Sequence, residues 1–320
     1  MVGTSHRGLT AGASRSAMQA MAVAAFLSVA VFAPCTRAKD PDRVEWSAAW
    51  PKFRLTEGVT TVGLASATIA FNFMTPPERP NWRGGILFDN WVRDNFRARS
   101  RAAQEHAADV SDYVYKGSLL IPSAIDIGVV TLGIHGRPDV AWQLLLINLQ
   151  SFAIAGALSV GSEHLVARAR PYTADCGADG KTRDKNGQPL FNACGGSQDN
   201  LDFFSGHTAA ASTMAGLTCA HHQHLPLYGG GVADLAPCIG LIGASIADGL
   251  GRIVADKHYA SDVTLGWGVG AFAGYVVPSL LHYGFTSNQR ASVGNAAGLR
   301  MVPLPQVYQG GLGLGVVGVF

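Results

Sequence analysis

Six long apolar segments constrain the fold of this 320-residue chain more than any other feature of its sequence. Each segment is longer than a typical β-strand and is rich in alanine, leucine and glycine, so a helix is predicted for each. The sequence therefore predicts an all-α protein built as a helical bundle. The segments are Glu57–Met74, Gly117–Ile134, Val140–Leu165, Gly206–Ala220, Leu235–Leu250 and Asp262–Leu281.

A glycine stripe distinguishes the last of these segments. Gly266, Gly270 and Gly274 recur every four residues, which places them on one face of a helix. Without side chains on that face, a neighbouring helix can approach closely. The spacing predicts that this helix packs tightly against another.

The composition narrows the class of partner. Charged residues make up 14% of the chain and hydrophobic residues 48%, whereas average soluble chains carry about 25% charged residues. The formal net charge is +2. A nucleic-acid-binding protein is usually more basic, with its basic residues clustered on one face. We therefore expect no nucleic-acid partner.

The first residues have the pattern of an export signal. Arg7 and Arg15 precede the uncharged stretch Ala17–Ala33, and Thr36–Ala38 offers small residues at a cleavage site. The interpretation is a signal peptide over residues 1–38 and a periplasmic location. The alternatives are an uncleaved first membrane helix and a lipoprotein signal read at Cys35, which the preceding Pro34 disfavours.

Four cysteines remain after the signal, an even number that suits an oxidising compartment. Cys176 and Cys194 bracket a polar stretch, which predicts that a disulfide closes it. Cys219 and Cys238 come close if their segments form antiparallel helices. Buried free thiols are the alternative, and for this second pair the two interpretations are nearly balanced.

The predicted helices divide the mature chain into three regions. Residues 39–116 form an N-terminal helical and polar region, and residues 117–284 form the core. Residues 285–320 form a β-like tail, because Leu312–Val316 alternates and Gly310–Gly311 suits a hairpin turn.

Two short motifs lie at the edges of apolar helices. Arg168 and Arg170 precede Pro171, which stops the helix, so both arginines are expected to project from its end. The run Ser205–Gly206–His207 begins the next apolar segment. A hydroxyl, a glycine amide and an imidazole at a helix N-terminus suit an oxyanion, because free N–H groups and the helix dipole favour negative charge there.

A third motif follows near the next helix. Arg252 is separated by five residues from His258, and Asp262 comes one helical turn later. At that spacing the Asp262 carboxylate is expected to hold the His258 ring and fix its tautomer. Each motif alone is weak, since a His–Asp pair of this kind is often structural. Their occurrence in order, each at a helix edge, indicates anion chemistry.

The three motifs together resemble the type 2 phosphatidic acid phosphatase (PAP2) and vanadium haloperoxidase superfamily, whose pattern is Lys-x6-Arg-Pro, Pro-Ser-Gly-His and Ser-Arg-x5-His-x3-Asp. The resemblance covers roughly residues 117–283. Three positions depart from the pattern: Glu163 replaces the lysine, Phe204 the proline and Gly251 the serine. A carboxylate at Glu163 would repel phosphate unless it pairs with an arginine, and Arg168 is the candidate to restore the missing charge.

The resemblance implies a bundle of the PAP2 type and a phosphatase without metal or other cofactor. His258 would be the nucleophile, Asp262 its orienting partner and His207 the general acid. The phosphate would be held by Arg170, Arg252, Ser205 and Gly206, with help from Arg168. Lys257, beside the nucleophile, is either a further phosphate ligand or a solvated neighbour.

The expected substrate is a phosphorylated lipid or a small organic phosphate. The alternatives are a vanadium-dependent haloperoxidase and a non-catalytic anion-binding helical protein. The helices carry many amides, glycines and alanines, which favours a soluble or peripherally attached periplasmic domain over one that spans the inner membrane. The cluster of His221, His222 and His224 lacks carboxylates at ligand spacing, so no metal site is expected there.

Overall fold

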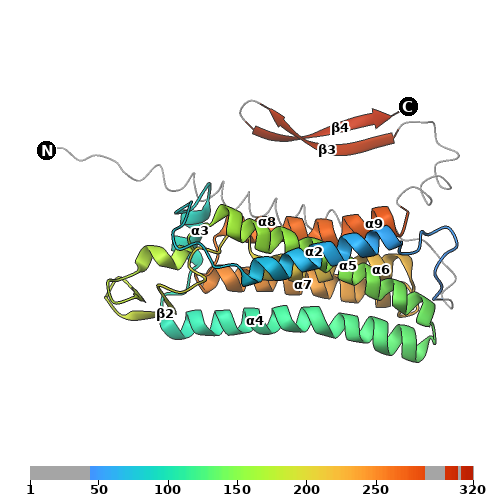
Figure 1. Cartoon of the computed structure of the whole chain (residues 1–320), viewed down its shortest axis with the longest axis horizontal. Coiled ribbons are helices and arrows are strands. Elements are labelled where there is room, and N and C mark those ends of the chain that lie inside the picture. The colour runs from blue at the N-terminus through green and yellow to red at the C-terminus, as the bar shows by residue number, and fades with distance from the viewer. Residues whose placement is uncertain (1–43, 285–299, 309–310, 320) are drawn as a thin grey trace.

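The computed structural model describes residues 44–284, together with the backbone of residues 300–308 and 311–319. The predicted signal peptide lies outside these residues. The long helices run side by side along the long axis of the molecule (Figure 1). In chain order the helices are α2 (Leu55–Phe73), α3 (Asp89–Phe96), α4 (Arg101–Ser123), α5 (Pro138–Val166), α6 (Gly206–His224), α7 (Val232–Val254), α8 (Ala260–Ala271) and α9 (Val277–Leu281).

All six apolar segments are helical, which confirms the predicted fold class. Several helices extend further than the apolar pattern suggested. Helix α4 begins at Arg101, where the Ser100 hydroxyl accepts a hydrogen bond from the amide of Ala103, and such a cap satisfies a free amide of the first turn. It continues through residue 117, the expected start of the core, into the π-helix η1 (Ala124–Ile134). A second π-helix, η3 (Phe272–Val276), joins α8 to α9.

The glycine stripe of α8 and η3 packs directly on α6. A Cβ atom added to Gly266 would lie 2.8 Å from the main-chain oxygen of Ser205, and one added to Gly270 or Gly274 would overlap the α6 backbone further along. Only glycine permits this approach. The predicted close packing is confirmed, and it leaves α6 almost wholly buried at the centre of the bundle.

The outer helices expose apolar side chains. Leu55 and Phe73 of α2 are 85% and 87% exposed. Four helical stretches are long and apolar enough to cross a membrane: Arg101–Ile134, Pro138–Val166, Val232–Val254 and Ala260–Leu281. This apolar surface indicates membrane association, so attachment to a membrane is favoured over the soluble form that the amide and glycine content suggested.

The predicted Cys176–Cys194 disulfide is confirmed, and Cys219 and Cys238, for which the sequence left two interpretations, also form one. Cys176–Cys194 closes the segment that carries the short hairpin β1 (Lys181–Arg183) and β2 (Pro189–Ala193). Cys219–Cys238 joins α6 to α7. Two disulfides fit an oxidising compartment.

The predicted C-terminal hairpin is also present. Strand β3 (Arg300–Tyr308) pairs antiparallel with β4 (Gly311–Val319), with Arg300 opposite Val319. The first glycine of the expected turn lies outside the described residues.

Candidate active site

The three motifs meet at one end of the bundle. Helix α5 ends there at Val166, α6 begins there at Gly206, α7 ends at Val254 and α8 begins at Ala260. This is the end that carries α3 and the β1–β2 hairpin in Figure 1. The amide of Ser205 donates to the carbonyl of Asp262 at 3.1 Å, which ties the starts of α6 and α8 together.

Main-chain carbonyls orient the guanidinium of Arg170. Its Nε donates to Gln198 O at 2.8 Å, its Nη2 to Leu201 O at 3.0 Å and its Nη1 to Lys257 O at 3.4 Å. The side chain is 8% exposed. Because these acceptors carry no net charge, the positive charge of Arg170 remains available to an anion.

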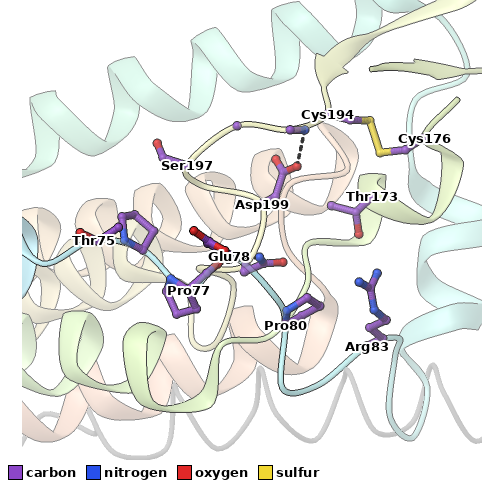
Figure 2. Close-up of a pocket in the computed structure, with 14 residues that line it drawn as sticks. Thr75, Pro77, Glu78, Pro80, Arg83, Thr173, Cys176, Cys194, Ser197 and Asp199 are labelled. Carbon is purple, nitrogen blue, oxygen red and sulfur yellow. Dashed lines mark hydrogen bonds between the residues drawn. A yellow bond between two sulfur atoms is a disulfide. The ribbon is translucent and has the colours of Figure 1, made fainter. Parts of the chain in front are cut away.

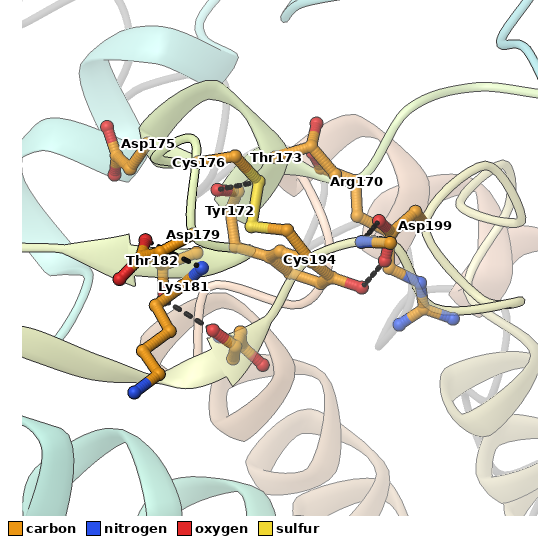
Figure 3. The surroundings of a disulfide bond; sticks show 12 residues. Arg170, Tyr172, Thr173, Asp175, Cys176, Asp179, Lys181, Thr182, Cys194 and Asp199 are labelled. Atoms are coloured by element: carbon orange, nitrogen blue, oxygen red, sulfur yellow. Dashed lines mark hydrogen bonds between the residues drawn. A yellow bond between two sulfur atoms is a disulfide. The ribbon is translucent and has the colours of Figure 1, made fainter.

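The segment that supplies two of these carbonyls is itself anchored. Tyr172 donates from its hydroxyl to Asp199 Oδ1 at 2.8 Å, and the Gly195 amide donates to Asp199 Oδ2 at 2.7 Å. Figure 3 shows Arg170 and Tyr172 beside Asp199, with the Cys176–Cys194 disulfide close by. The disulfide therefore holds the loop that positions Arg170.

A pocket of about 590 Å³ lies on this loop (Figure 2). Its wall includes the disulfide and Asp199, and residues before α3 close its other side. None of the motif residues lines it. The lining residues are Thr75, Pro76, Pro77, Glu78, Pro80, Arg83, Thr173, Cys176, Cys194, Gly195, Gly196, Ser197, Asp199 and Asn200.

Arg168 does not occupy the position expected for a phosphate ligand. Its side chain is fully buried between the rings of Trp82 and Tyr259, with Cζ 4.0 Å and 4.1 Å from the ring centroids. Its guanidinium pairs with Asp89 at 2.8 Å and with Asp262 at 2.5 Å. Because two carboxylates already neutralise this arginine, Arg168 is not placed to bind phosphate as the sequence suggested.

The partner of His258 also differs from the expectation. Asp262 directs Oδ1 to Arg168, and its Oδ2 accepts from the Tyr259 amide at 2.9 Å. Instead, Nδ1 of His258 lies 3.0 Å from the main-chain oxygen of Asp202 and 2.8 Å from its Oδ1. The orienting contacts of His258 therefore come from Asp202, a residue without a role in the three motifs.

His258 is buried in a positive surrounding. Burial, followed by the charges of Arg170 and Arg252, lowers its pKa well below the usual value of a histidine. The ring is therefore neutral, and a neutral ring with a proton on Nδ1 leaves the lone pair of Nε2 free. That is the state that a nucleophilic histidine requires.

The second motif begins α6. Ser205 is the N-cap, and its fully buried hydroxyl interacts with Thr208 Oγ1 at 3.0 Å. Gly206 follows, where an added Cβ would meet Ser159 Oγ at 2.8 Å. The Ser205 hydroxyl is thus engaged in capping, while the N-terminus of α6 still presents its dipole to the site.

His207 projects from this N-terminus toward α4. Its ring lies 4.3 Å from that of Tyr115, and its Nε2 lies 3.3 Å from Oδ1 of Asp112. The same carboxylate oxygen accepts from Arg252 Nη1 at 2.8 Å. Asp112 therefore bridges two motif residues. It lies in the polar stretch before the expected core, and no spacing signal distinguished it there from the neighbouring carboxylates.

The charge surrounding His207 is strongly positive. Burial, followed by Arg252, lowers its pKa to about 3, while Asp112 acts in the opposite direction. Lys257 contributes to the same field, and its own pKa falls to about 8 because of burial and the nearby Arg252 and Arg170. Lys257 thus lies among the cations near His207, whereas Arg168, from which additional charge was expected, does not.

Glu163, at the family's lysine position, faces the start of α6. Its Oε1 would lie 3.5 Å from a Cβ added to Gly206. It also lies within the electrostatic influence of Arg170. Burial disfavours the ionised form of this carboxyl group, and the charge of Arg170 opposes that effect.

The three clustered histidines near the end of α6 all have partners within the protein. His221 contacts Asn148 and Tyr283, and the ring of His222 lies between Asp126 and Asp234. His224 stacks on Tyr283, and its Nδ1 lies 2.8 Å from Ala220 O. Each ring is thus part of the hydrogen-bond network at the far end of the bundle.

Comparison with known proteins agrees with this geometry. Residues 144–285 match the model of the PAP2 superfamily. The match covers α6, α7 and α8 with all the residues of the three motifs, whereas Asp89 and Asp112 precede it. No curated protein matches the chain.

Proposed function

We propose, on the premise that residues 144–285 belong to the PAP2 superfamily, that this chain is a phosphatase that hydrolyses phosphate monoesters through a covalent phosphohistidine. Family membership supports a phosphatase-type hydrolase. The finer proposal rests on one observation: the rings of His258 and His207 lie within the field of the same two arginines, Arg170 and Arg252.

The phosphate group binds between these cations. Arg170 and Arg252 neutralise its oxygens, and Lys257 adds a third positive charge. The N-terminus of α6, at Gly206, directs its amides toward the same anion. Because these groups are held in place before binding, they stabilise the charge that develops during phosphoryl transfer.

In the first step, Nε2 of His258 attacks phosphorus. The P–N bond forms and the bond from phosphorus to the ester oxygen breaks. The leaving oxygen takes a proton from His207, so an alcohol departs and His207 becomes neutral. Throughout this step, Nδ1–H of His258 stays hydrogen-bonded to Asp202. This bond holds the imidazole ring in place while the ring acquires positive charge.

In the second step, water attacks the phosphohistidine. His207 accepts a proton from this water as the new P–O bond forms and the P–N bond breaks. Inorganic phosphate leaves, and both histidines return to their starting states. The residues named supply every proton transfer in this cycle.

The substrate class follows from the exposed apolar surface. Four helices that are long and apolar enough to cross a membrane would hold the site close to a lipid surface. We therefore propose a phosphorylated lipid as the favoured substrate, with small organic phosphates as weaker ones.

The test is hydrolysis of a phosphatidate in mixed micelles and of p-nitrophenyl phosphate by the purified chain. Wild-type protein should release phosphate in the presence of a chelator, and His258→Ala should release none. Acid-labile phosphate attached to wild type during turnover would support the intermediate. Absence of turnover on both substrates would contradict the proposal, and anion binding alone would favour a non-catalytic role.

A further inference from the structure

Asp202 presents two oxygens to the ring nitrogen of His258. Its main-chain oxygen lies 3.0 Å from Nδ1 and its Oδ1 lies 2.8 Å from the same atom. A main-chain carbonyl only accepts hydrogen bonds, so Nδ1 carries the proton. Asp202 thereby fixes the tautomer in which Nε2 can attack.

Asp262, four residues after His258, is occupied elsewhere. Its oxygens meet the guanidinium of Arg168 and the amide of Tyr259. Each of these is a strong donor, so the negative charge of Asp262 is already compensated by Arg168. Asp262 is suited to anchoring this region rather than to contacting the ring directly.

The two carboxyl groups lie next to each other. A ring nitrogen of His258 and carboxyl oxygens of Asp202 and Asp262 all fall within 4.8 Å of one another. Both aspartates are 0% exposed, and two buried carboxylates so close together cannot both ionise without a large cost.

The proton belongs on Asp202. Within residues 44–284, neither of its carboxyl oxygens has a hydrogen-bond partner of suitable geometry when both are treated as acceptors. A protonated carboxyl removes this deficit, because it donates to a neighbouring oxygen. Burial, followed by the charge of Asp262, also raises the pKa of Asp202 well above its usual value.

We propose that Asp202 is the positioning residue of His258: its main-chain oxygen accepts from Nδ1–H, and its side chain is a neutral carboxylic acid that donates its O–H to Asp262 and so anchors Asp202 beside the ring. This inference rests on the proposed function, in which His258 is the nucleophile. Asp202 thus connects the His258 ring to the Asp262–Arg168 ion pair, so that neither residue of this pair needs to contact the ring directly.

A bound cation is the competing use of these three side chains. Arg168 already neutralises Asp262, and Arg170 and Arg252 place further positive charge around His258. This surrounding disfavours a metal ion and favours a shared proton.

Asparagine and alanine at position 202 separate the possibilities. An asparagine can donate to Asp262 from its amide, as the neutral acid does from its O–H. Asp202→Asn should retain most of kcat. Asp202→Ala keeps the main-chain oxygen but loses the side chain that anchors it, so kcat should fall about 100-fold through misplacement of the ring. KM should change little in either variant, because Asp202 does not face the phosphate.

Two results would overturn the inference. One is wild-type kcat in Asp202→Ala. The other is a loss in folded Asp202→Asn equal to that in the alanine variant, which would show that the negative charge matters. If the alanine variant does not fold, the asparagine variant decides alone: retained kcat supports the proposal and lost kcat opposes it.

The matched control is Asp234→Ala. Asp234 is likewise a buried aspartate beside a histidine ring, His222, but at the other end of the bundle. Its loss should lower the thermal unfolding temperature and leave kcat unchanged. A general effect of losing a buried carboxylate would therefore appear in both alanine variants.

Orthovanadate binding distinguishes failure of this inference from failure of the proposed function. Calorimetry with orthovanadate needs no turnover, and binding that is lost in His258→Ala reports on the ring. If wild type binds vanadate but hydrolyses no ester, the proposed function fails. Asp202 is then judged by vanadate affinity, which should fall about 10-fold or more in Asp202→Ala and stay near wild type in Asp202→Asn.

Discussion

Oδ1 of Asp112 lies 3.3 Å from Nε2 of His207, the proposed general acid. A carboxylate at this distance favours the protonated ring, opposing the effects of burial and of Arg252. Helix α4, which precedes the family match, therefore contributes a charged side chain beside the proposed general acid.

Asp112→Asn should impair leaving-group protonation. Without the carboxylate the pKa of His207 falls further, so less of the acid is available at any pH above it. We expect kcat to fall at least about 10-fold for an alkyl phosphate and much less for p-nitrophenyl phosphate, whose leaving group needs no proton. Steady-state kinetics on both esters measures this difference. Glu105→Gln, an exposed site on the same helix, is the control, and equal losses on both esters would count against the assignment.

The pH profile should favour acid. His207 must be protonated to donate, and its pKa in the free site is lowered to about 3 by burial and Arg252. The protonated fraction therefore decreases as pH rises, and kcat/KM for an alkyl phosphate should fall through the neutral range. His258 must be neutral, and its pKa is lowered well below the usual value, so it stays active in mild acid. A maximum of kcat/KM above pH 7 would contradict these roles.

The two disulfides should have similar effects on stability and different effects on catalysis. They close loops of similar length, with sequence separations of 18 and 19 residues, so removal of either should cost about 3 kcal/mol. Only Cys176–Cys194 holds the loop that orients Arg170. Cys176→Ser/Cys194→Ser should lower kcat/KM about 10-fold or more, while Cys219→Ser/Cys238→Ser leaves it unchanged. Denaturant unfolding and ester hydrolysis measure the two quantities, and equal kinetics in the two double variants would disprove the link to Arg170.

Arg168→Met should destabilise the protein strongly. The substitution keeps an apolar stem between Trp82 and Tyr259 but leaves Asp89 and Asp262 buried without their cation. Breaking a buried ion pair in this way costs about 3–5 kcal/mol. Thermal unfolding of the detergent-solubilised protein tests this, with Arg183→Met, on an exposed ion pair, as the control. A phosphate ligand would instead give a higher KM at unchanged stability.

Glu163→Gln should strengthen phosphate binding. Above neutral pH, where this buried carboxyl group is ionised, the substitution removes a negative charge near Gly206 and Arg170 while preserving the shape of the side chain. With the effective dielectric of a protein site, we expect KM to fall by about two- to tenfold. Inhibition by inorganic phosphate gives an independent measurement. An unchanged inhibition constant would place the carboxylate outside the electrostatic reach of the substrate.

The helices and the meeting of the three motifs were predictable because their signals are local. An apolar run longer than a strand and rich in alanine and leucine favours a helix, and motifs at helix ends lie together once the helices pack antiparallel. The close packing of the glycine stripe and the pairing of Cys176 with Cys194 were likewise predicted from the spacing of these residues. These features depend on spacing along the chain, which the sequence records directly.

The partners of the charged side chains were not predictable in this way. Arg168 and Arg170 are two residues apart in one motif, yet one is paired between Asp89 and Asp262 and the other faces the site. Asp202 and Asp112 gain their roles only from the side chains that the fold places beside them. A single buried carboxylate leaves no spacing pattern in the sequence. Its partner is therefore known only from the tertiary structure.

The glycine stripe that packs α8 against α6 places the proposed acid, His207, and the proposed nucleophile, His258, in one rigid unit. His207 is the second residue of α6, and His258 lies two residues before the start of α8. Helices in backbone contact cannot slide or separate without opening a void. Changes in bilayer thickness or lateral pressure would therefore bend the outer helices first. The separation between the two histidines should stay constant from one lipid environment to another, and the outer helices would adapt to the membrane in their place.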